Sequence, residues 1–179
     1  MAKKVILASG SPRRKELLEQ VGVEFEQRVS GKEERYTATE PKEIVKELAL
    51  MKAENVASDI EAEKGLLIDT VVIGADTIVV LDGQILGKPR NEEHAFEMLQ
   101  NLQGRSHEVY TGVAFLSYNK EGKKEVISHA VETKVHVHEM SEKVIREYVA
   151  TKDPMDKAGG YGIQGVFAAY IDGIEGDYY

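Results

Sequence analysis

The chain of 179 residues contains no cysteine and no tryptophan, and only four prolines. The absence of cysteine excludes disulfide bonds and thiolate metal sites. No apolar run approaches about 18 residues, and the N-terminus is polar within its first four residues, so the sequence predicts neither a transmembrane helix nor a signal peptide. We therefore expect a cytoplasmic protein.

Positive charge is also scarce, because 23 lysines and arginines stand against 31 aspartates and glutamates, for a net charge of -8. Nucleic acids and acidic membranes attract positively charged proteins, so we expect neither a nucleic-acid partner nor a membrane partner. The length and the 42% apolar composition allow one good core. No repeat or low-complexity linker marks a boundary. The sequence predicts a single domain, residues 1–179.

The first glycine-containing turn, residues 8–15, joins an apolar run to a helical pattern that begins after Ser11, its predicted N-cap. Arg13 and Arg14 follow in the first turn of that helix, where the helix dipole opposes each exposed cation by about 0.3–1 kcal/mol. Together with the free N–H groups of a helix start, these cations indicate an anion site, with phosphate as the leading candidate. The alternative is a solvated basic turn that binds nothing.

Lysine 52 interrupts an apolar helix face. Pro41 opens a predicted helix that extends to Ala57, and at about 100° per residue Lys52 projects near the middle of its apolar stripe. Burying an unpaired ammonium is expensive. Lys52 therefore either extends its ammonium to solvent or meets an anion such as a phosphate, and both alternatives stay open.

A carboxylate follows a predicted buried strand. Residues 71–73 predict that strand and residues 74–77 follow it, so we expect Asp76 at a strand end, between apolar segments. Such a carboxylate usually has a cation or metal partner, with a surface turn as the alternative. Further on, Gly87-Lys88-Pro89 superficially resembles a nucleotide loop, but it lacks both the spacing and the hydroxyl of a Walker A loop.

A second glycine-rich stretch covers residues 156–165. It satisfies the G-x-G-x-x-G pattern, but it follows a predicted helix, precedes a strand-like segment at 166–171, and leaves no room for a dinucleotide fold. The pattern instead favours a loop whose backbone can approach a ligand closely. Lys157 supplies a cation to this loop and Gln164 an amide.

Taken together, the chain offers separated cations, several carboxylates and a glycine loop. The cations are Arg13, Lys52, Lys88 and Lys157, and the carboxylates are Glu33, Glu34 and Asp76. These groups are typical of a site for a metal-bound polyphosphate, with magnesium or manganese as the expected cofactor. Without a cysteine or a recognisable serine–histidine pair, direct attack by water is favoured over a covalent intermediate.

Five motifs in order resemble the Maf family, also called septum formation proteins. They are Leu7 to Leu18, Gly74-Ala75-Asp76-Thr77, Gly87-Lys88-Pro89, Gly104-Arg105-Ser106-His107, and Met155 to Gly159 with Ile163-Gln164-Gly165. The resemblance implies a mixed α/β fold similar to the inosine-triphosphate pyrophosphatases, with a twisted central sheet, flanking helices and a cleft between two lobes. It also implies a nucleoside triphosphate pyrophosphatase that uses a divalent metal.

The resemblance also implies roles for individual residues. Asp76 would be the proton acceptor, with Lys52 and Glu34 as further catalytic candidates and with Asp76 and Glu34 as metal ligands. Arg13, Thr77 and Gln164 match the branch that acts on dTTP and UTP. The full substrate-binding set is Ser9, Ser11, Arg13, Arg14, Thr77, Lys88, Lys157 and Gln164.

The sequence departs from the family pattern at its end. Maf chains usually continue past a Gly-Asp-Tyr-like segment into a closing helix, and this expected C-terminal tail is absent after Tyr179. The choice between ordinary and modified pyrimidine nucleotides and the question of a homodimer stay open. The family's second name suggests an alternative class, a non-catalytic nucleotide-binding regulator of cell division, although nothing in the sequence favours it.

Overall fold

The computed structural model describes residues 3–179 of the chain, which form a mixed α/β fold with four α-helices and seven strands. The strands are β1 (Lys4–Ala8), β2 (Glu26–Gln27), β3 (Thr70–Leu81), β4 (Gln84–Leu86), β5 (Ser106–Tyr118), β6 (Lys124–Val137) and β7 (Ile171–Glu175). The helices are α1 (Pro12–Gln20), α2 (Pro41–Lys64), α3 (Glu92–Leu102) and α4 (Glu142–Ala150), with short 3-10 segments at Asp153–Asp156, Ala158–Gly160 and Val166–Tyr170.

The strands form one mixed sheet in the order β2-β1-β3-β5-β6-β7, and β4 pairs with β3 off this path. β1 runs parallel to both β2 and β3, whereas β4 is antiparallel to β3 and β7 is antiparallel to β6. In the central parallel pair, Ile6 lies opposite Val72 and Ala8 opposite Gly74. The mixed α/β fold that we predicted is therefore confirmed.

By its internal contacts, the chain divides into two compact units. Unit 1 contains the chain up to Asp76 together with Thr111–Ala130, and unit 2 contains Thr77–Tyr110 and Val131–Tyr179. Strands β3, β5 and β6 contribute residues to both units. The prediction of a single domain stays a prediction.

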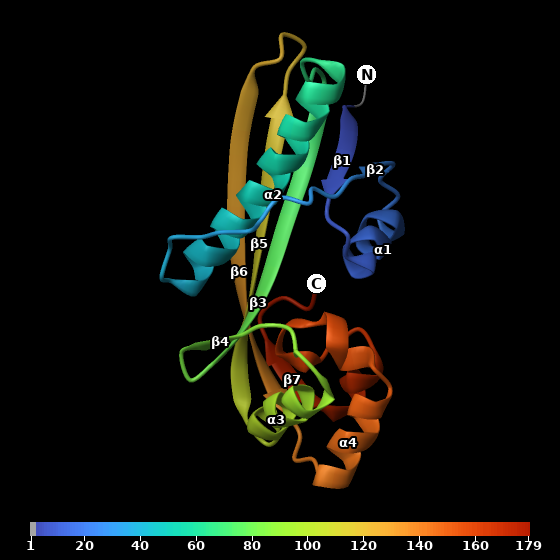
Figure 1. Cartoon of the computed structure of the whole chain (residues 1–179), viewed down its shortest axis with the longest axis vertical. Coiled ribbons are helices and arrows are strands. Elements are labelled where there is room, and N and C mark those ends of the chain that lie inside the picture. Colours follow the sequence, from blue (N-terminus) through green and yellow to red (C-terminus); the bar gives the residue numbers. More distant parts are fainter. Residues whose placement is uncertain (1–2) are drawn as a thin grey trace. The chain divides into compact units, whose positions relative to one another are not determined.

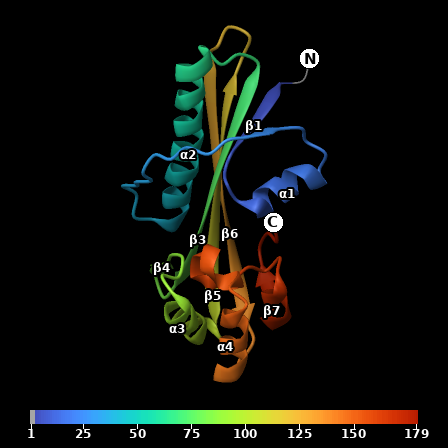
Figure 2. The same ribbon diagram turned by 45° about the vertical axis from the view of Figure 1, so that its right-hand side comes forward.

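Helix α2 covers one side of the strands in unit 1 (Figures 1 and 2). The backbone of α2 lies unusually close to the strands at two glycines, one in β3 and one in β5. A Cβ atom on Gly74 of β3 would overlap the carbonyl oxygen of Ala49 and lie 2.9 Å from the Ala53 nitrogen. A Cβ atom on Gly112 of β5 would overlap the Val45 carbonyl. Only glycine lets the helix backbone lie this close to both strands.

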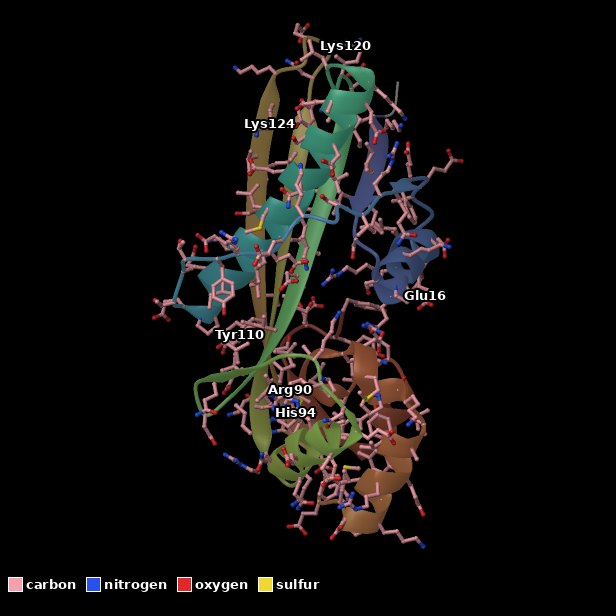
Figure 3. The ribbon with its side chains drawn as sticks, viewed as in Figure 1. Glu16, Arg90, His94, Tyr110, Lys120 and Lys124 are labelled. Carbon is pink, nitrogen blue, oxygen red and sulfur yellow. The ribbon has the colours of Figure 1, made fainter. Side chains whose placement is uncertain are left out.

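The same helix is longer than the sequence predicted, because it continues past Ala57 to Lys64 and ends at Gly65, whose φ is 84°. Its outer surface is charged, and Lys124 of β6, labelled in Figure 3, pairs with Glu54 of α2 at 3.2 Å. Across residues 3–179, no helix combines the length and the apolarity needed to cross a membrane.

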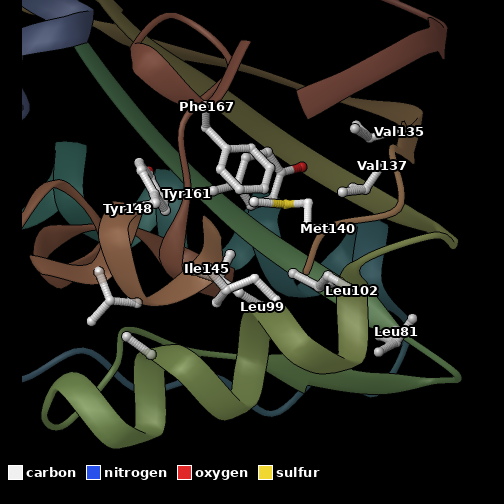
Figure 4. Close-up of a cluster of buried hydrophobic side chains, with 12 residues drawn as sticks. Leu81, Leu99, Leu102, Val135, Val137, Met140, Ile145, Tyr148, Tyr161 and Phe167 are labelled. Carbon is white, nitrogen blue, oxygen red and sulfur yellow. The ribbon is translucent and has the colours of Figure 1, made fainter. Parts of the chain in front are cut away.

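Unit 2 has its own apolar core, in which side chains of α3 and α4 meet those of β6 and of the chain after α4 (Figure 4). Phe167 lies at 0% exposure among Tyr148, Tyr161 and Ile145. Local signals mark the ends of its elements. For example, the Asn91 side chain accepts the His94 N–H at 2.8 Å, at the start of α3, where Arg90 also donates to the His94 ring (Figure 3).

Two predicted elements differ from the structure. Asp76 was expected at a strand end, but β3 continues without a break from Thr70 to Leu81, because both faces of this strand are covered and Gly74 serves packing instead of a turn. The segment at 166–171 was expected to be a strand, yet Val166–Tyr170 is a 3-10 helix. That helical turn directs Phe167 into the core, and strand β7 begins only at Ile171.

The close approach at Gly74 predicts a large penalty for any added side chain. We expect Gly74→Ala to lower the free energy of unfolding by about 1–3 kcal/mol or more, since the methyl group would meet helix backbone that cannot move independently. Urea denaturation measures this loss. Gly173→Ala, where nothing lies within 4 Å of the new Cβ atom, is the matched control, and equal stabilities of the two variants would contradict the packing argument.

Candidate functional site

The turn between β1 and α1 is organised by the hydroxyl of Ser9, which is only 4% exposed. Ser9 Oγ accepts hydrogen bonds from the backbone N–H of Ser11 at 3.2 Å and from Arg14 Nη1 at 3.0 Å. Gln27 Nε2 donates to the Ser9 carbonyl at 2.7 Å. Ser11 occupies the N-cap position with Pro12 after it, as predicted, but its side chain forms no capping bond. The Ser9 hydroxyl therefore orders this turn.

Arg14 lies in the electrostatic field of acidic residues of unit 1. Burial lowers the pKa of its guanidinium, whereas the carboxylates of Asp76 and Glu34 act in the opposite direction. The charge of Arg13 further lowers this pKa. Because an arginine guanidinium is not deprotonated in proteins, Arg14 remains a cation at physiological pH. The turn thus brings a fixed positive charge toward the carboxylates.

Lys52 bridges two of the predicted site carboxylates. Its ammonium donates a hydrogen bond to Asp76 Oδ1 and lies 3.2 Å from Glu34 Oε2. The side chains of Lys52 and Asp76 are 20% and 13% exposed, whereas Glu34 is half exposed. Lys52 therefore does not extend to open solvent. The anions that it meets in this structure are carboxylates of the chain itself.

The contact of α2 with β3 explains how this pair forms. Gly74 and Asp76 are two residues apart on one strand, so their Cβ directions lie on the same face of the sheet. The helix backbone touches that face at Ala49 and Ala53, and Lys52 directly precedes Ala53. An ammonium at position 52 is thereby brought beside a carboxylate at position 76.

The loop that contains Glu34 runs antiparallel along α2. Lys32 pairs with Asp59 at 2.7 Å, Glu34 with Lys52 at 3.2 Å, and Thr37 donates to Glu47 from its N–H at 2.8 Å and from its hydroxyl at 2.9 Å. Partners 59, 52 and 47 follow one another back along the helix: the spacing of seven keeps Asp59 and Lys52 on one face, and the spacing of five turns Glu47 by about 140° from Lys52, so the loop also passes around α2. Glu33 instead points to Arg35 at the surface and is 72% exposed.

Glu47 is a residue that sequence reasoning missed. Its carboxylate accepts three hydrogen bonds from the loop, the two from Thr37 and one from the Ala38 N–H at 3.0 Å, and these bonds lower its pKa. No sequence signal distinguishes it from the other glutamates on the polar side of α2. Its role follows from the path of the loop.

The remaining predicted residues lie in unit 2. Lys88 and Gln164 are exposed, and Thr77 follows Asp76 within β3. The Gly159 N–H donates to the Gly87 carbonyl at 3.0 Å, so the two glycine-containing segments that include Lys88 and Gln164 are joined by a backbone bond.

Lys157 has partners within its own segment. Its ammonium lies 2.9 Å from Asp153 Oδ1 and 2.8 Å from Asp156 Oδ1, and it donates to the Asp153 carbonyl at 2.5 Å. The side chain is 11% exposed. An anionic ligand would have to compete with two carboxylates for this cation.

The donor set for a divalent metal consists of Asp76 and Glu34. Among residues 3–179, no group of three or more histidines and carboxylates is arranged to hold a metal ion. Magnesium is commonly bound by one or two protein carboxylates together with substrate phosphates and water. Two carboxylates on a shared lysine fit such a metal if a polyphosphate supplies the other oxygens.

Comparisons with known proteins agree on one family. The family described as Maf-like protein matches residues 4–179. The chain is 50% identical to the dTTP/UTP pyrophosphatase of Lachnoclostridium phytofermentans, over 98% of this chain and 86% of that protein. It is 49% identical to the dTTP/UTP pyrophosphatase of Agathobacter rectalis, over 97% of this chain and 88% of that protein.

Two solved structures are more distantly similar, each with 16% identity. One is a nucleoside-triphosphatase, dITP/XTP pyrophosphatase from Mycobacterium abscessus, with a TM-score of 0.42 over 76% of this chain and 75% of that chain. The other is the Ham1 protein of Staphylococcus aureus, with a TM-score of 0.45 over 74% of this chain and 72% of that chain.

The Glu47 bonds predict a pH-dependent order of the Glu34 loop. The pKa of Glu47 in the folded protein is lowered from 4.5. The stabilisation that its carboxylate gives to the loop is therefore complete above pH 4.5 and is lost as the pH falls through the lowered pKa. We expect the Thr37 and Ala38 amides to exchange faster in Glu47→Gln at neutral pH, and faster in the parent protein under acid conditions after correction for intrinsic rates.

The matched control for this experiment is Glu43→Gln, which removes an exposed carboxylate paired with Lys46 on the same helix. Amide exchange followed by NMR measures both variants. Unchanged protection of Thr37 and Ala38 in Glu47→Gln would show that the loop is ordered by other contacts.

Proposed function

Because this chain belongs to the Maf-like protein family, with a match over residues 4–179 and about 50% identity to dTTP/UTP pyrophosphatases, we propose that it hydrolyses dTTP and UTP to the nucleoside monophosphate and pyrophosphate. The observation that carries the proposal is the nearly buried Asp76–Lys52 pair with Glu34 and Arg14 beside it. Such a cluster supplies both a proton acceptor and the cations that phosphoryl chemistry requires.

In the proposed reaction, water attacks the α-phosphorus of the triphosphate. Asp76 accepts a proton from this water, the new P–O bond forms, and the anhydride bond between the α- and β-phosphates breaks so that pyrophosphate leaves. The Asp76 carboxylate is 13% exposed, so it can reach a water molecule at the surface of unit 1 while its position stays restrained by Lys52. Restraint of the acceptor favours a reactive geometry.

Lys52 and the arginines of the first helix would stabilise the charge that builds up on the phosphate oxygens. Cations held in place before the reaction are effective because they need no reorganisation in the transition state. Lys52 is held by Asp76 and Glu34, and Arg14 by Ser9. A bound phosphate oxygen would accept a hydrogen bond from the Lys52 ammonium in place of Asp76. Asp76 could then accept the proton of the attacking water.

Asp76 and Glu34 would hold the magnesium or manganese ion that this activity calls for. When bound, the ion would neutralise phosphate charge. The two carboxylates already share one cation, Lys52, which supports their ability to hold positive charge at this place.

The substrate-binding set remains a proposal. It comprises Ser9, Ser11, Arg13 and Arg14 in unit 1, and Thr77, Lys88, Lys157 and Gln164 in unit 2. The exposure of Lys88 and Gln164 supports contact with a ligand, whereas the carboxylate partners of Lys157 favour a role in holding its segment. A cytoplasmic location, a homodimeric assembly and the use of modified pyrimidine nucleotides stay predictions.

The substrate proposal predicts a clear preference in a triphosphate panel. With magnesium or manganese present, we expect dTTP and UTP to be hydrolysed well above ATP and GTP, and pyrophosphate release measures each rate. Equal rates with the purine nucleotides would contradict the pyrimidine assignment. Nucleotide binding without turnover of any triphosphate would favour the alternative of a non-catalytic regulator.

The role of Asp76 predicts that binding and turnover separate on substitution. Asp76→Asn keeps the side-chain shape and removes the charge, so the variant should fold and bind dTTP while turnover falls by about 10²-fold or more, as expected for loss of a general base or metal ligand. Calorimetry measures affinity, and pyrophosphate release at saturating dTTP measures turnover.

The matched control is Asp82→Asn, which also removes a carboxylate paired with a cation, here Arg105 at 2.7 Å. Asp82 has a φ of 51°, a conformation that asparagine tolerates. We expect this control to keep the parent turnover. Near-parent turnover of a folded Asp76→Asn variant would remove Asp76 from the mechanism.

A further inference from the structure

One family motif has no role in the proposed chemistry, namely Gly104-Arg105-Ser106-His107 at the start of β5. Its last residue, His107, is completely buried in unit 2. The Nε2 atom of His107 lies 2.5 Å from the Tyr161 hydroxyl, and the two rings meet edge to face with their centroids 5.3 Å apart. The Nδ1 atom is buried and has no partner within residues 3–179. A buried imidazole with a single polar contact calls for an explanation.

The chemistry of this contact follows from burial. Burial, with a smaller effect from His136, lowers the pKa of His107 to about 4, so the ring is neutral at physiological pH. A neutral imidazole has one N–H donor. Since orphaned buried N–H groups are rarer than orphaned acceptors, we place the proton on Nε2, where it donates to the Tyr161 oxygen. The hydrogen bond that the ring donates is then to Tyr161.

Tyr161 is the anchor of the glycine-rich loop, defined here as residues 159–165. Four of these seven residues are glycine, and Gly159 and Gly160 have φ values of 69° and 77°. Glycine backbones lose more conformational entropy on ordering than any others, so the loop needs a side chain that fixes it. Tyr161 is 7% exposed and packs on Phe167, with ring centroids 4.8 Å apart, whereas Gln164 is exposed.

We infer that His107 is a positioning residue, which holds Tyr161 and thereby orders the glycine-rich loop and the Gln164 amide that the loop carries. The bond from the Gly159 N–H to the Gly87 carbonyl extends this order to the segment with Lys88. The inference rests on the proposed function, in which Gln164 and Lys88 contact the nucleotide. Because His107 touches neither substrate nor reacting atoms, its loss weakens substrate binding more than turnover.

The test uses the full chain with His107→Phe, Tyr161→Phe and the double variant. Each single variant leaves one buried polar partner unpaired, which lowers the melting temperature, while the double variant removes both partners and recovers most of it. We expect KM for dTTP to rise by about fivefold to tenfold in all three variants, including the double one, with kcat within about threefold of the parent. Recovery of KM together with the melting temperature would overturn the inference, because it is the outcome of a purely structural role.

Two further variants sharpen this test. His107→Gln can place an amide N–H near the position of Nε2, and we expect it to return KM to near the parent value. Ile145→Val loosens the same core without changing the contact between His107 and Tyr161, so it should lower the melting temperature and leave KM unchanged. If KM also rose in Ile145→Val, the rise in KM of the His107 and Tyr161 variants would follow from lowered stability alone, and the inference would be overturned.

A readout without nucleotide separates this inference from the proposed function. Hydrogen exchange of the amides in residues 159–165 should be faster in His107→Phe and in the double variant than in the parent, even where the melting temperature has recovered. Unchanged exchange would overturn the inference whatever the activity. Failure of the parent to hydrolyse any triphosphate would instead overturn the proposed function, and the exchange result would still decide whether His107 orders the loop.

Discussion

The close approach of α2 to β3 at Gly74 is the constraint on which the candidate site depends. Helix backbone occupies the space that a side chain at position 74 would need, so the helix lies close enough to place Lys52 beside Asp76. The same helix receives the Glu34 loop through Asp59, Lys52 and Glu47. A single packing contact between glycine and helix backbone thus determines where the acid, the lysine and the loop of unit 1 meet.

The electrostatic arrangement of unit 1 follows from that packing. A largely buried carboxylate and ammonium are costly to remove from water, and only mutual pairing with good hydrogen bonds offsets this cost. Asp76 and Lys52 meet that condition, and Glu34 adds a second, more exposed carboxylate to the same ammonium. An ammonium shared by two carboxylates can exchange one of them for a phosphate oxygen without becoming unpaired, which suits the binding and release of a polyphosphate that we propose for this site.

In unit 2, the main structural requirement is the ordering of a chain segment that is rich in glycine. The glycines of this segment give its backbone many accessible conformations. The side chain of Tyr161 restricts them, because it packs against Phe167 and is hydrogen-bonded to the buried imidazole of His107. Lys157 contributes by tying Asp153 and Asp156 together just before the loop. Exposed polar groups such as Gln164 therefore sit on a backbone that is fixed from its buried side.

The sequence by itself determined the features that depend on neighbouring residues. Asp82-Gly83 forms a two-residue hairpin turn with φ values of 51° and 76°, Pro41 opens α2, and Asn91 caps α3, because each of these signals acts within a few residues. The ordered motifs also identified the family. Only the tertiary structure decided the continuation of β3 through Asp76, the partners of Lys52, the role of Glu47 and the pairing of His107 with Tyr161, 54 residues apart. These features arise where distant segments pack together, and a local pattern of residue types contains no information about which buried group will meet which partner.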